Sequence, residues 1–231
     1  MVFAGGIALA AVAVVAVTVY AWQPTVRADA DAGEAALAKI APTLRPPEDL
    51  KPRLTVAMTV LYSLPLEGVI ALRDDAVTPT DDGEPTFAQH PSDLLLILQM
   101  AGPAATNPSL RSEAIQTLRS QGPIQTDGYS RVGIPERIVT VVAGRERDAI
   151  VSTLARPDGS QVRQSQSIID ADGGPLVVVL RRSMDRFEPD EVRRLIESVP
   201  WRGVQEAEQR ALDAAGSRRI LDGGAGADAS E

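Results

Sequence analysis

QVRQSQSIIDADGGPLVVVLRR, residues 161–182, contains two strand-like runs separated by an Asp-Gly pair, which favours the tight turn of a β-hairpin. The second run, PLVVVLRR, is almost continuously apolar, and this pattern predicts a strand in the middle of a sheet. The first run, SQVRQSQSII at residues 160–169, is polar at most positions, so we predict an edge strand. An edge strand can pair with a strand of a protein partner; the plainer alternative is that Arg163 guards the edge against pairing.

Two further runs precede this hairpin and extend the pattern. RIVTVV at residues 137–142 and AIVSTLA at residues 149–155 are rich in β-branched residues, and a second Asp-Gly turn follows at residues 158–159. Four consecutive strand-like runs joined by short turns predict an antiparallel meander in the C-terminal half of the chain.

An earlier alternating pattern begins at Arg53. Apolar side chains occupy every second position there, which predicts a strand: Leu54, Val56, Met58, Val60 and Tyr62. A helix through the same segment is the alternative. VIALR at residues 69–73 predicts a second strand after a turn, and residues 74–91 predict a long polar loop.

Two segments after the polar loop predict helices. SDLLLILQM at residues 92–100 is apolar nearly all round, so we predict a short buried helix. Asn107 can cap a second helix that begins at Pro108 and ends before Gly122. The inward stripe of that second helix is expected to consist of Leu110, Ala114, Ile115 and Leu118.

The clearest helical pattern in the chain follows Phe187. Pro189 fits the first turn of a helix, and apolar residues recur after it at helical spacing: Val192, Leu195, Ile196 and Val199. Phe187 can pack against Val192 as a hydrophobic staple. We therefore predict a helix whose apolar stripe faces the core.

The N-terminal segment FAGGIALAAVAVVAVTVYA, residues 3–21, holds no charged residue. A membrane-spanning helix needs ~20 apolar residues, so we expect a single transmembrane helix that anchors the chain in a lipid bilayer. A cleaved export signal that ends at Ala28, before Asp29, is one alternative. A buried helix of a soluble domain is another.

The residues after this segment indicate on which side of the membrane the body lies and how far it stands from the membrane. Read literally, the positive-inside rule places the body in the cytoplasm, because Arg27, Lys39 and Arg45 follow the apolar segment. We nevertheless expect an extracytoplasmic body, since a natural start further upstream could supply basic residues before the span. Residues 33–41 predict a short Ala-rich helix, and four prolines within residues 41–52 predict a stiff spacer between membrane and body.

The composition excludes several classes of function. A net charge of −8 argues against a general nucleic-acid binder. The absence of Cys removes disulfides, thiol nucleophiles and Cys-based zinc sites. His90 is the only histidine, so a Ser-His-Asp triad would have to use it; an ordinary loop histidine is the simpler interpretation. The sequence has no P-loop and no dinucleotide-binding glycine motif after a strand.

Charged clusters are the remaining candidate sites. Acidic residues crowd the polar loop and could hold calcium or serve a hydrolase, with solvated turn residues as the plainer alternative: Asp74, Asp75, Asp81, Asp82 and Glu84. Asp170 and Asp172 echo the start of a calcium loop, without its remaining ligands. Arginine pairs recur at 181–182, 193–194 and 218–219. The first two flank Phe187 and could converge on an anionic group, but Asp190 and Glu191 offer Arg193 and Arg194 ordinary surface ion pairs.

These patterns predict an α+β fold: a transmembrane helix, a Pro-rich linker, and a mostly antiparallel sheet packed with about three helices. The expected divisions are an anchor or signal at 1–28, a linker at 29–52, a globular domain at 53–203, a further helix at 204–221 and a disordered tail at 222–231. We expect an interaction or ligand-binding role at the bacterial cell envelope, with a protein partner there and no nucleic acid. The alternatives are a subunit of a larger membrane assembly and a carboxylate-based hydrolase. We assign no catalytic residue and predict no cofactor and no metal site.

Overall fold

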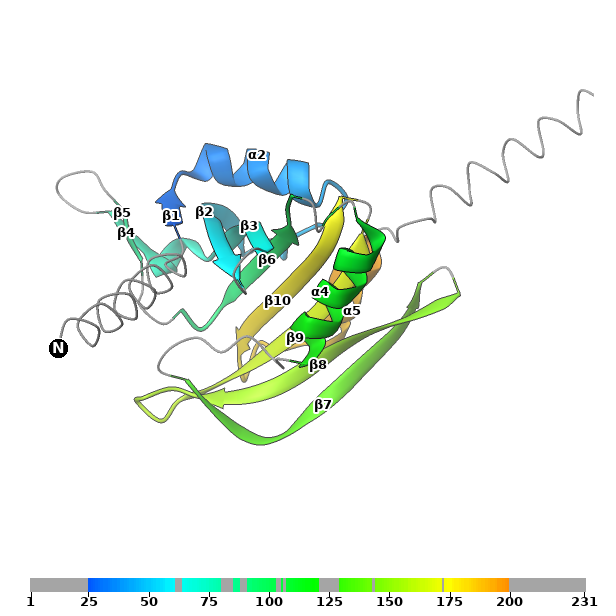
Figure 1. Cartoon of the computed structure of the whole chain (residues 1–231). Helices are drawn as coiled ribbons and strands as arrows, with labels where there is room; N and C mark the ends of the chain where they lie inside the picture. Colours follow the sequence, from blue (N-terminus) through cyan, green and yellow to red (C-terminus); the bar gives the residue numbers. More distant parts are fainter. Residues whose placement is uncertain are drawn as a thin grey trace, which may run out of the picture.

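One antiparallel sheet dominates the computed structural model of the protein (Figure 1). The structure describes residues 25–60, 64–79, 85–87, 91–102, 105, 107–120, 129–142, 144–171 and 173–199. Within these ranges the sheet has eight strands in the order β1-β2-β3-β6-β10-β9-β8-β7. Their bounds, in that order, are Thr25–Ala28, Lys51–Val60, Leu64–Leu72, Leu94–Met100, Gly174–Ser183, Gln161–Ala171, Arg145–Ala155 and Ser130–Val142.

Three helices in the described part cover both faces of this sheet: α2 (Ala30–Ile40), α4 (Pro108–Ser120) and α5 (Pro189–Ser198). Helices α2 and α5 share one apolar core with the sheet, which includes Ile40 from the first and Leu195 from the second. Helix α4 packs Ala114 and Leu118 into a second core on the opposite face. In Figure 1, α2 lies across β1, β2 and β3, while α4 lies in front of β9 and β10. The fold is therefore α+β with a helix layer on each side.

The predicted meander is present. Strands β7 to β10 follow one another as antiparallel neighbours, and Gly159 and Gly174, at two of the three hairpins, have positive φ angles of 84° and 130°. Strand β10 is central, as its apolar run predicts, because it pairs with both β9 and β6. The strands expected from residues 53 and 69 onward are also confirmed as β2 and β3.

The edge position predicted for residues 160–169 is wrong. Strand β9 pairs with β10 on one side and, from Gln161 to Gln166, with β8 on the other, so it lies inside the sheet and not at its edge. Its polar side chains are buried and hydrogen-bonded: Gln164 accepts from Arg181, and Ser167 donates to the Asp148 carbonyl. A buried polar group with a partner loses little on leaving water, so a polar strand can occupy the interior. The edges are β7 and β1.

The helix predicted at residues 92–100 is also wrong. This segment contains β6, which lies between β3 and β10. Its side chains point to both cores: Leu95 and Ile97 belong to the core beneath α2 and α5, and Leu98 and Met100 to the core beneath α4. A strand buried on both faces is continuously apolar and shows no alternation, so periodicity cannot distinguish it from a buried helix.

The helix predicted at residues 33–41 is confirmed as α2, and the helices predicted from Pro108 and Pro189 are confirmed as α4 and α5, with one change in packing. Asn107 caps α4 by accepting from the Ser109 amide at 3.0 Å, and Leu195 and Ile196 of α5 are buried. In α4, however, Leu110 is exposed and Arg111 points inward instead. The Arg111 guanidinium donates to the carbonyls of Ala105 and Ala171 and to the Asp170 carboxylate, so it caps neighbouring backbone.

The Pro-rich segment after α2 packs on the body. Ala41, Leu44 and Leu50 are buried in the core shared by α2 and α5. This packing means that residues 41–50 do not act as an extended spacer. The polar loop from residue 74 is likewise partly ordered, since it contains a 3₁₀ turn at Asp74–Ala76 and the small hairpin of β4 (Val77–Pro79) and β5 (Pro85–Phe87).

Several expectations fall on residues outside the described ranges. These are the apolar segment 3–21, the helix expected at 204–221 and the tail at 222–231. Among the described residues, no helix is long and apolar enough to cross a membrane.

Candidate ligand-binding cleft

A cleft of about 400 Å³ lies between α2 and the β1–β2–β3 end of the sheet. The register explains which side chains form its floor. Arg27 of β1 is paired with Thr55 of β2, and Ala57 of β2 is paired with Glu67 of β3. Thr55 is also the partner of Val69, which belongs to the core beneath α2. Because alternate residues of a strand share a face, all four floor residues point toward α2.

Small residues create the space. At the start of α2, Gly33 lets the helix approach β2 closely, since a Cβ at this position would lie 3.2 Å from the Pro52 carbonyl carbon. The Asp29 carboxylate caps the helix, and the Asp29 amide donates to the Arg53 carbonyl at 3.2 Å. Further along the helix, the cleft is lined by Ala36 opposite Ala57. The short side chains on both walls leave a hollow that larger residues would fill.

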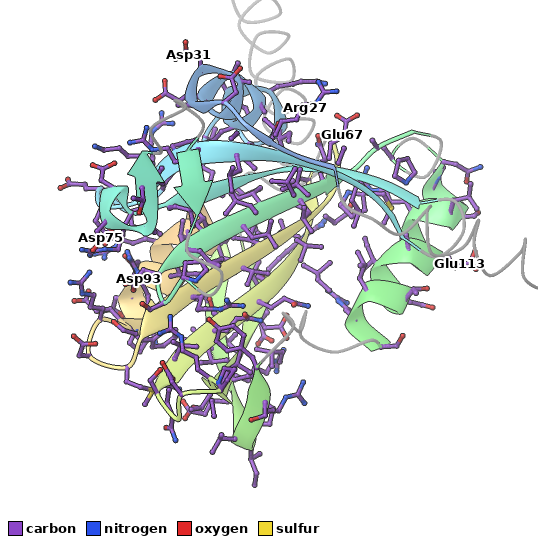
Figure 2. The ribbon with its side chains drawn as sticks, turned by 90° about the vertical axis from the view of Figure 1, so that its left-hand side faces the viewer. Arg27, Asp31, Glu67, Asp75, Asp93 and Glu113 are labelled. Atoms are coloured by element: carbon purple, nitrogen blue, oxygen red, sulfur yellow. The ribbon has the colours of Figure 1, made fainter. Side chains whose placement is uncertain are left out.

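Charged side chains surround the cleft. Lys39 of α2 lies 3.6 Å from Glu67, but both side chains are largely exposed, at 76% and 54%. An exposed ion pair of this kind contributes about 0–1 kcal/mol, so Lys39 is easily drawn to another anion. Arg27 makes no ion pair and no side-chain hydrogen bond with any other described residue. Figure 2 shows Arg27 and Glu67 on one side of α2, and Asp31 on the other.

An ionic cluster lies elsewhere on the same face of the sheet, where Arg182 of β10 is 3% exposed. Its guanidinium binds Asp49 through two hydrogen bonds of 2.8 Å, and it also binds Glu191 of α5. These carboxylates raise the pKa of Arg182, although burial acts in the opposite direction. The hydrogen bonds that Arg182 donates lower the pKa of Asp49. The cluster joins the linker, the sheet and α5.

A groove of about 690 Å³ borders this cluster, between residues 45–49 and α5. Its two most buried carboxylates, Asp49 and Glu191, are already bound by Arg182. The groove also holds Arg45, Glu48 and Arg194, which form no ion pair with another described residue. Because residues 45–49 form one of its walls, we regard it as part of the packing of the linker.

A small pocket of about 290 Å³ holds two carboxylates, Asp75 and Asp93, beside Arg73 (Figure 2). Two hydrogen bonds of 2.9 Å from Arg73 lower the pKa of Asp75. Burial raises the pKa of Asp93, because its nearest arginine contacts, at 3.8 and 3.9 Å to Arg186 and Arg182, are longer than hydrogen bonds. The two carboxyls of one pocket thus differ in proton affinity.

The sequence candidates are dispersed. Asp74 forms ion pairs with Lys51 and Arg53, and Asp170 with Arg111. No group of three potential metal-ligating side chains was found among the described residues. Five further candidates lie outside the described ranges: His90, Asp81, Asp82, Glu84 and Asp172, as does the arginine pair at 218–219.

The two arginine pairs that lie among the described residues, at 181–182 and 193–194, do not converge on one site. Arg181 stacks on the Tyr129 ring at 4.3 Å, whereas its neighbour Arg182 points to the opposite face of the sheet. Arg193 forms the predicted surface ion pair with Asp190. The sequence did not predict the position of Arg27 in the cleft, because TVRA at residues 25–28 is too short to show a strand pattern of its own.

Comparisons with known proteins give little further information. No protein-family profile matches the chain, and no curated protein matches it. A solved structure that resembles it is that of LpqN from Mycobacterium tuberculosis, described as involved in cell envelope biogenesis. The two chains are 14% identical, and the match covers 77% of this chain and 79% of that chain with a TM-score of 0.21. The structural similarity to this envelope protein is weak, and at this TM-score it carries no argument about function.

Proposed function

We propose that the protein is a single-pass, membrane-linked domain of the bacterial cell envelope that binds a ligand in the cleft beneath α2. Residues 3–21 would form the anchor, because they are uncharged and of spanning length. The cleft supplies the binding site, with apolar walls and a few charged groups around it, which is the usual make-up of a small-molecule site.

The position of β1 carries this proposal. Strand β1 begins at Thr25, directly after the expected anchor, and it is paired with β2 along its whole length. Arg27 follows Ala21 by six positions in the sequence, and an extended chain of six residues reaches at most roughly 20 Å. An anchor at residues 3–21 would therefore hold Arg27 and the cleft beside the bilayer surface. The Pro-rich residues 41–50 cannot increase the distance between the anchor and Arg27, because they come after α2 in the chain and are packed on the core.

Membrane extraction tests the anchor. We expect the full chain to remain in membranes through an alkaline carbonate wash, and a chain that starts at Thr25 to be recovered in the soluble fraction. This truncation retains β1, so a loss of membrane binding would not reflect damage to the sheet. Release of the full chain by carbonate would refute the anchor.

We also propose that the body lies outside the cytoplasm. The chain has no Cys, so a single introduced thiol reports its position without background. Glu146→Cys places that thiol at an exposed site in the β7–β8 hairpin. A membrane-impermeant maleimide should label it in intact cells; labelling only after lysis would place the body in the cytoplasm.

A subunit role in a larger membrane assembly is a second candidate, favoured by the exposed edge strand β7. Ile134 is 92% exposed, and Val141 on the same strand is also exposed. Pro135 and the bulge between Val132 and Glu136 interrupt the backbone edge there, so a partner would contact side chains and not extend the sheet. A photo-crosslinker at Ile134 should then give one discrete adduct in cells, and the same group at exposed Glu113 of α4 should not.

A carboxylate-based hydrolase is a third candidate, and the opposite pKa shifts of Asp75 and Asp93 favour it, because an acid and a base need such a difference. Hydrolysis of a panel of chromogenic glycosides and esters by the full chain tests this. Activity that is lost in both Asp75→Asn and Asp93→Asn would support it, and activity unchanged in both would exclude the pocket.

A further inference from the structure

We infer that the cleft beneath α2 binds the phosphate-bearing headgroup of an anionic phospholipid from the leaflet beside it. This inference rests on the proposed function, since it requires the anchor at residues 3–21. It adds the chemical class of the ligand and the residues that select it: Arg27 and Lys39 contact the phosphate, and the small residues of the walls make room for the glycerol part.

Charge complementarity is the first argument. Arg27 lines the cleft and has no ion pair among the described residues, and Lys39 has only the long, exposed pair with Glu67. A phosphate between them would engage Arg27 and could take Lys39 from Glu67 without a large loss, because exposed pairs contribute little. Arginine and lysine are the residues that bind phosphate most readily.

The short distance between the cleft and the bilayer surface is the second argument. Basic side chains gain about 1 kcal/mol each near an anionic membrane surface, and the attraction decays over ~10 Å. The reach from Ala21 to Arg27 is at most roughly 20 Å, about two such decay lengths, so Arg27 stays close to the bilayer surface. A soluble phosphate has no comparable local concentration, so the lipid is the favoured source.

The size and lining of the cleft are the third argument. Its volume of about 400 Å³ suits a headgroup and not a whole lipid. The apolar part of the lining comes from Ala36, Ile40 and Ala57, which can contact the glycerol and first methylene groups. The headgroup would thus enter between α2 and the sheet while the acyl chains remain in the bilayer.

Photo-crosslinking in nanodiscs tests the inference with the full chain. A photo-reactive group on the lipid headgroups leaves the small side chains of the cleft unchanged. Adducts at Ala36 then report on the cleft, and adducts at Trp22 report on the bilayer surface. The discs contain phosphatidylcholine with a minority of phosphatidylglycerol, and mass spectrometry identifies the lipid adducts. We expect the adducts at position 36, but not those at position 22, to be enriched in phosphatidylglycerol severalfold over the bulk composition.

Two arginine substitutions test whether Arg27 is the side chain that selects the anionic lipid. Arg27→Gln should lower the enrichment at position 36 roughly fivefold, the factor that corresponds to about 1 kcal/mol. Arg131→Gln removes an exposed arginine from β7, at the opposite edge of the sheet, and should leave the enrichment unchanged. Equal enrichment in both variants would overturn the role of Arg27.

The remaining outcomes separate this inference from the proposed function. Lipid adducts at position 22 without any at position 36, or adducts at position 36 that follow the bulk composition, would overturn the headgroup assignment and leave the anchor intact. Displacement of the position 36 adducts by glycerol phosphate at an equal headgroup concentration would assign the cleft to a soluble phosphate ester. Absence of adducts at both positions would refute the anchor itself.

Discussion

Arg182 and Asp49 lie 133 residues apart in the sequence and form a double hydrogen bond, with both N–O distances at 2.8 Å. The Arg182 side chain is almost fully buried, whereas that of Asp49 is 41% exposed. Asp49 belongs to the linker and Arg182 to the central strand, so the pair fixes the segment that follows α2 onto the sheet. Helix α5 joins through Glu191. This contact shows that the Pro-rich segment is part of the fold.

Removal of the Asp49 charge tests this connection. Asp49→Asn should destabilise the protein by about 1–2 kcal/mol in urea unfolding, below the 3–5 kcal/mol of a fully buried pair, because Asp49 is partly exposed and Glu191 remains bound to Arg182. Asp74→Asn is the matched control. Asp74 also bonds two basic side chains, Lys51 and Arg53, but at the surface, so we expect little change. Equal destabilisation in the two variants would contradict the structural role of Asp49.

The same pair should show an acid dependence. Because the pKa of Asp49 is lower in the folded state than its ordinary value of 3.8, its contribution to stability is complete above that value. The contribution is lost as the pH falls through the lowered pKa. The stability difference between the wild type and Asp49→Asn should therefore be constant near neutral pH and shrink below a pH of about 3.8. A difference that disappears between pH 7 and pH 5 would contradict this assignment.

Asp93 should behave in the opposite way. Burial raises its pKa in the folded state, so its stabilising effect is complete below its ordinary value of 3.8 and is lost as the pH rises through the raised pKa. At pH 7 the ionised group is a net cost. Asp93→Asn keeps an oxygen that can accept from the Ser183 amide, so this variant should be at least as stable as the wild type at pH 7. Its advantage should vanish in acid. A strong loss at pH 7 would show that the arginines outweigh burial.

Helix α5 offers a direct test of core packing. Leu195 is buried beneath the helix, so Leu195→Ala should cost about 2–5 kcal/mol in chemical unfolding. Arg193 lies on the exposed side of the same helix and, among the described residues, forms an ion pair with Asp190 alone, so Arg193→Ala should change stability by no more than about 0.5 kcal/mol. Similar unfolding midpoints for the two variants would mean that the apolar stripe is misassigned.

The parts of the fold that sequence could predict are those with local patterns. Helix α5 has a clear apolar stripe, and the Asp-Gly turn before β10 marks a hairpin. Strand β6 has no such pattern, because its neighbours bury both of its faces. Strand β9 was wrongly predicted as an edge strand because its side chains are polar. The partners that allow these side chains to be buried, including Arg181, come from other strands and cannot be read from the sequence of β9.

The candidate cleft depends on long-range pairing even more. TVRA becomes a strand only because β2 pairs with it, and the same four letters fit the end of an export signal equally well. The small residues Ala36 and Ala57 are unremarkable in sequence, and they form a hollow only when α2 lies across β2. The sequence shows that Arg27 carries a positive charge, but it does not show that Arg27 lies in a cleft.

The boundary between β1 and α2 provides the last prediction. Cleavage after Ala28, as an export signal would require, would remove all four residues of β1 and expose the backbone of β2 from Leu54 to Ala57. It would also place a new positive charge at Asp29, the residue that caps α2, where the helix dipole disfavours it. We therefore expect a body that starts at Thr25 to melt several degrees above one that starts at Asp29. We also expect the N-terminus of the protein purified from cells to lie before Thr25. Sequencing that finds Asp29 first, with equal melting of the two truncated bodies, would show that β1 is dispensable and that the N-terminal segment is a cleaved signal.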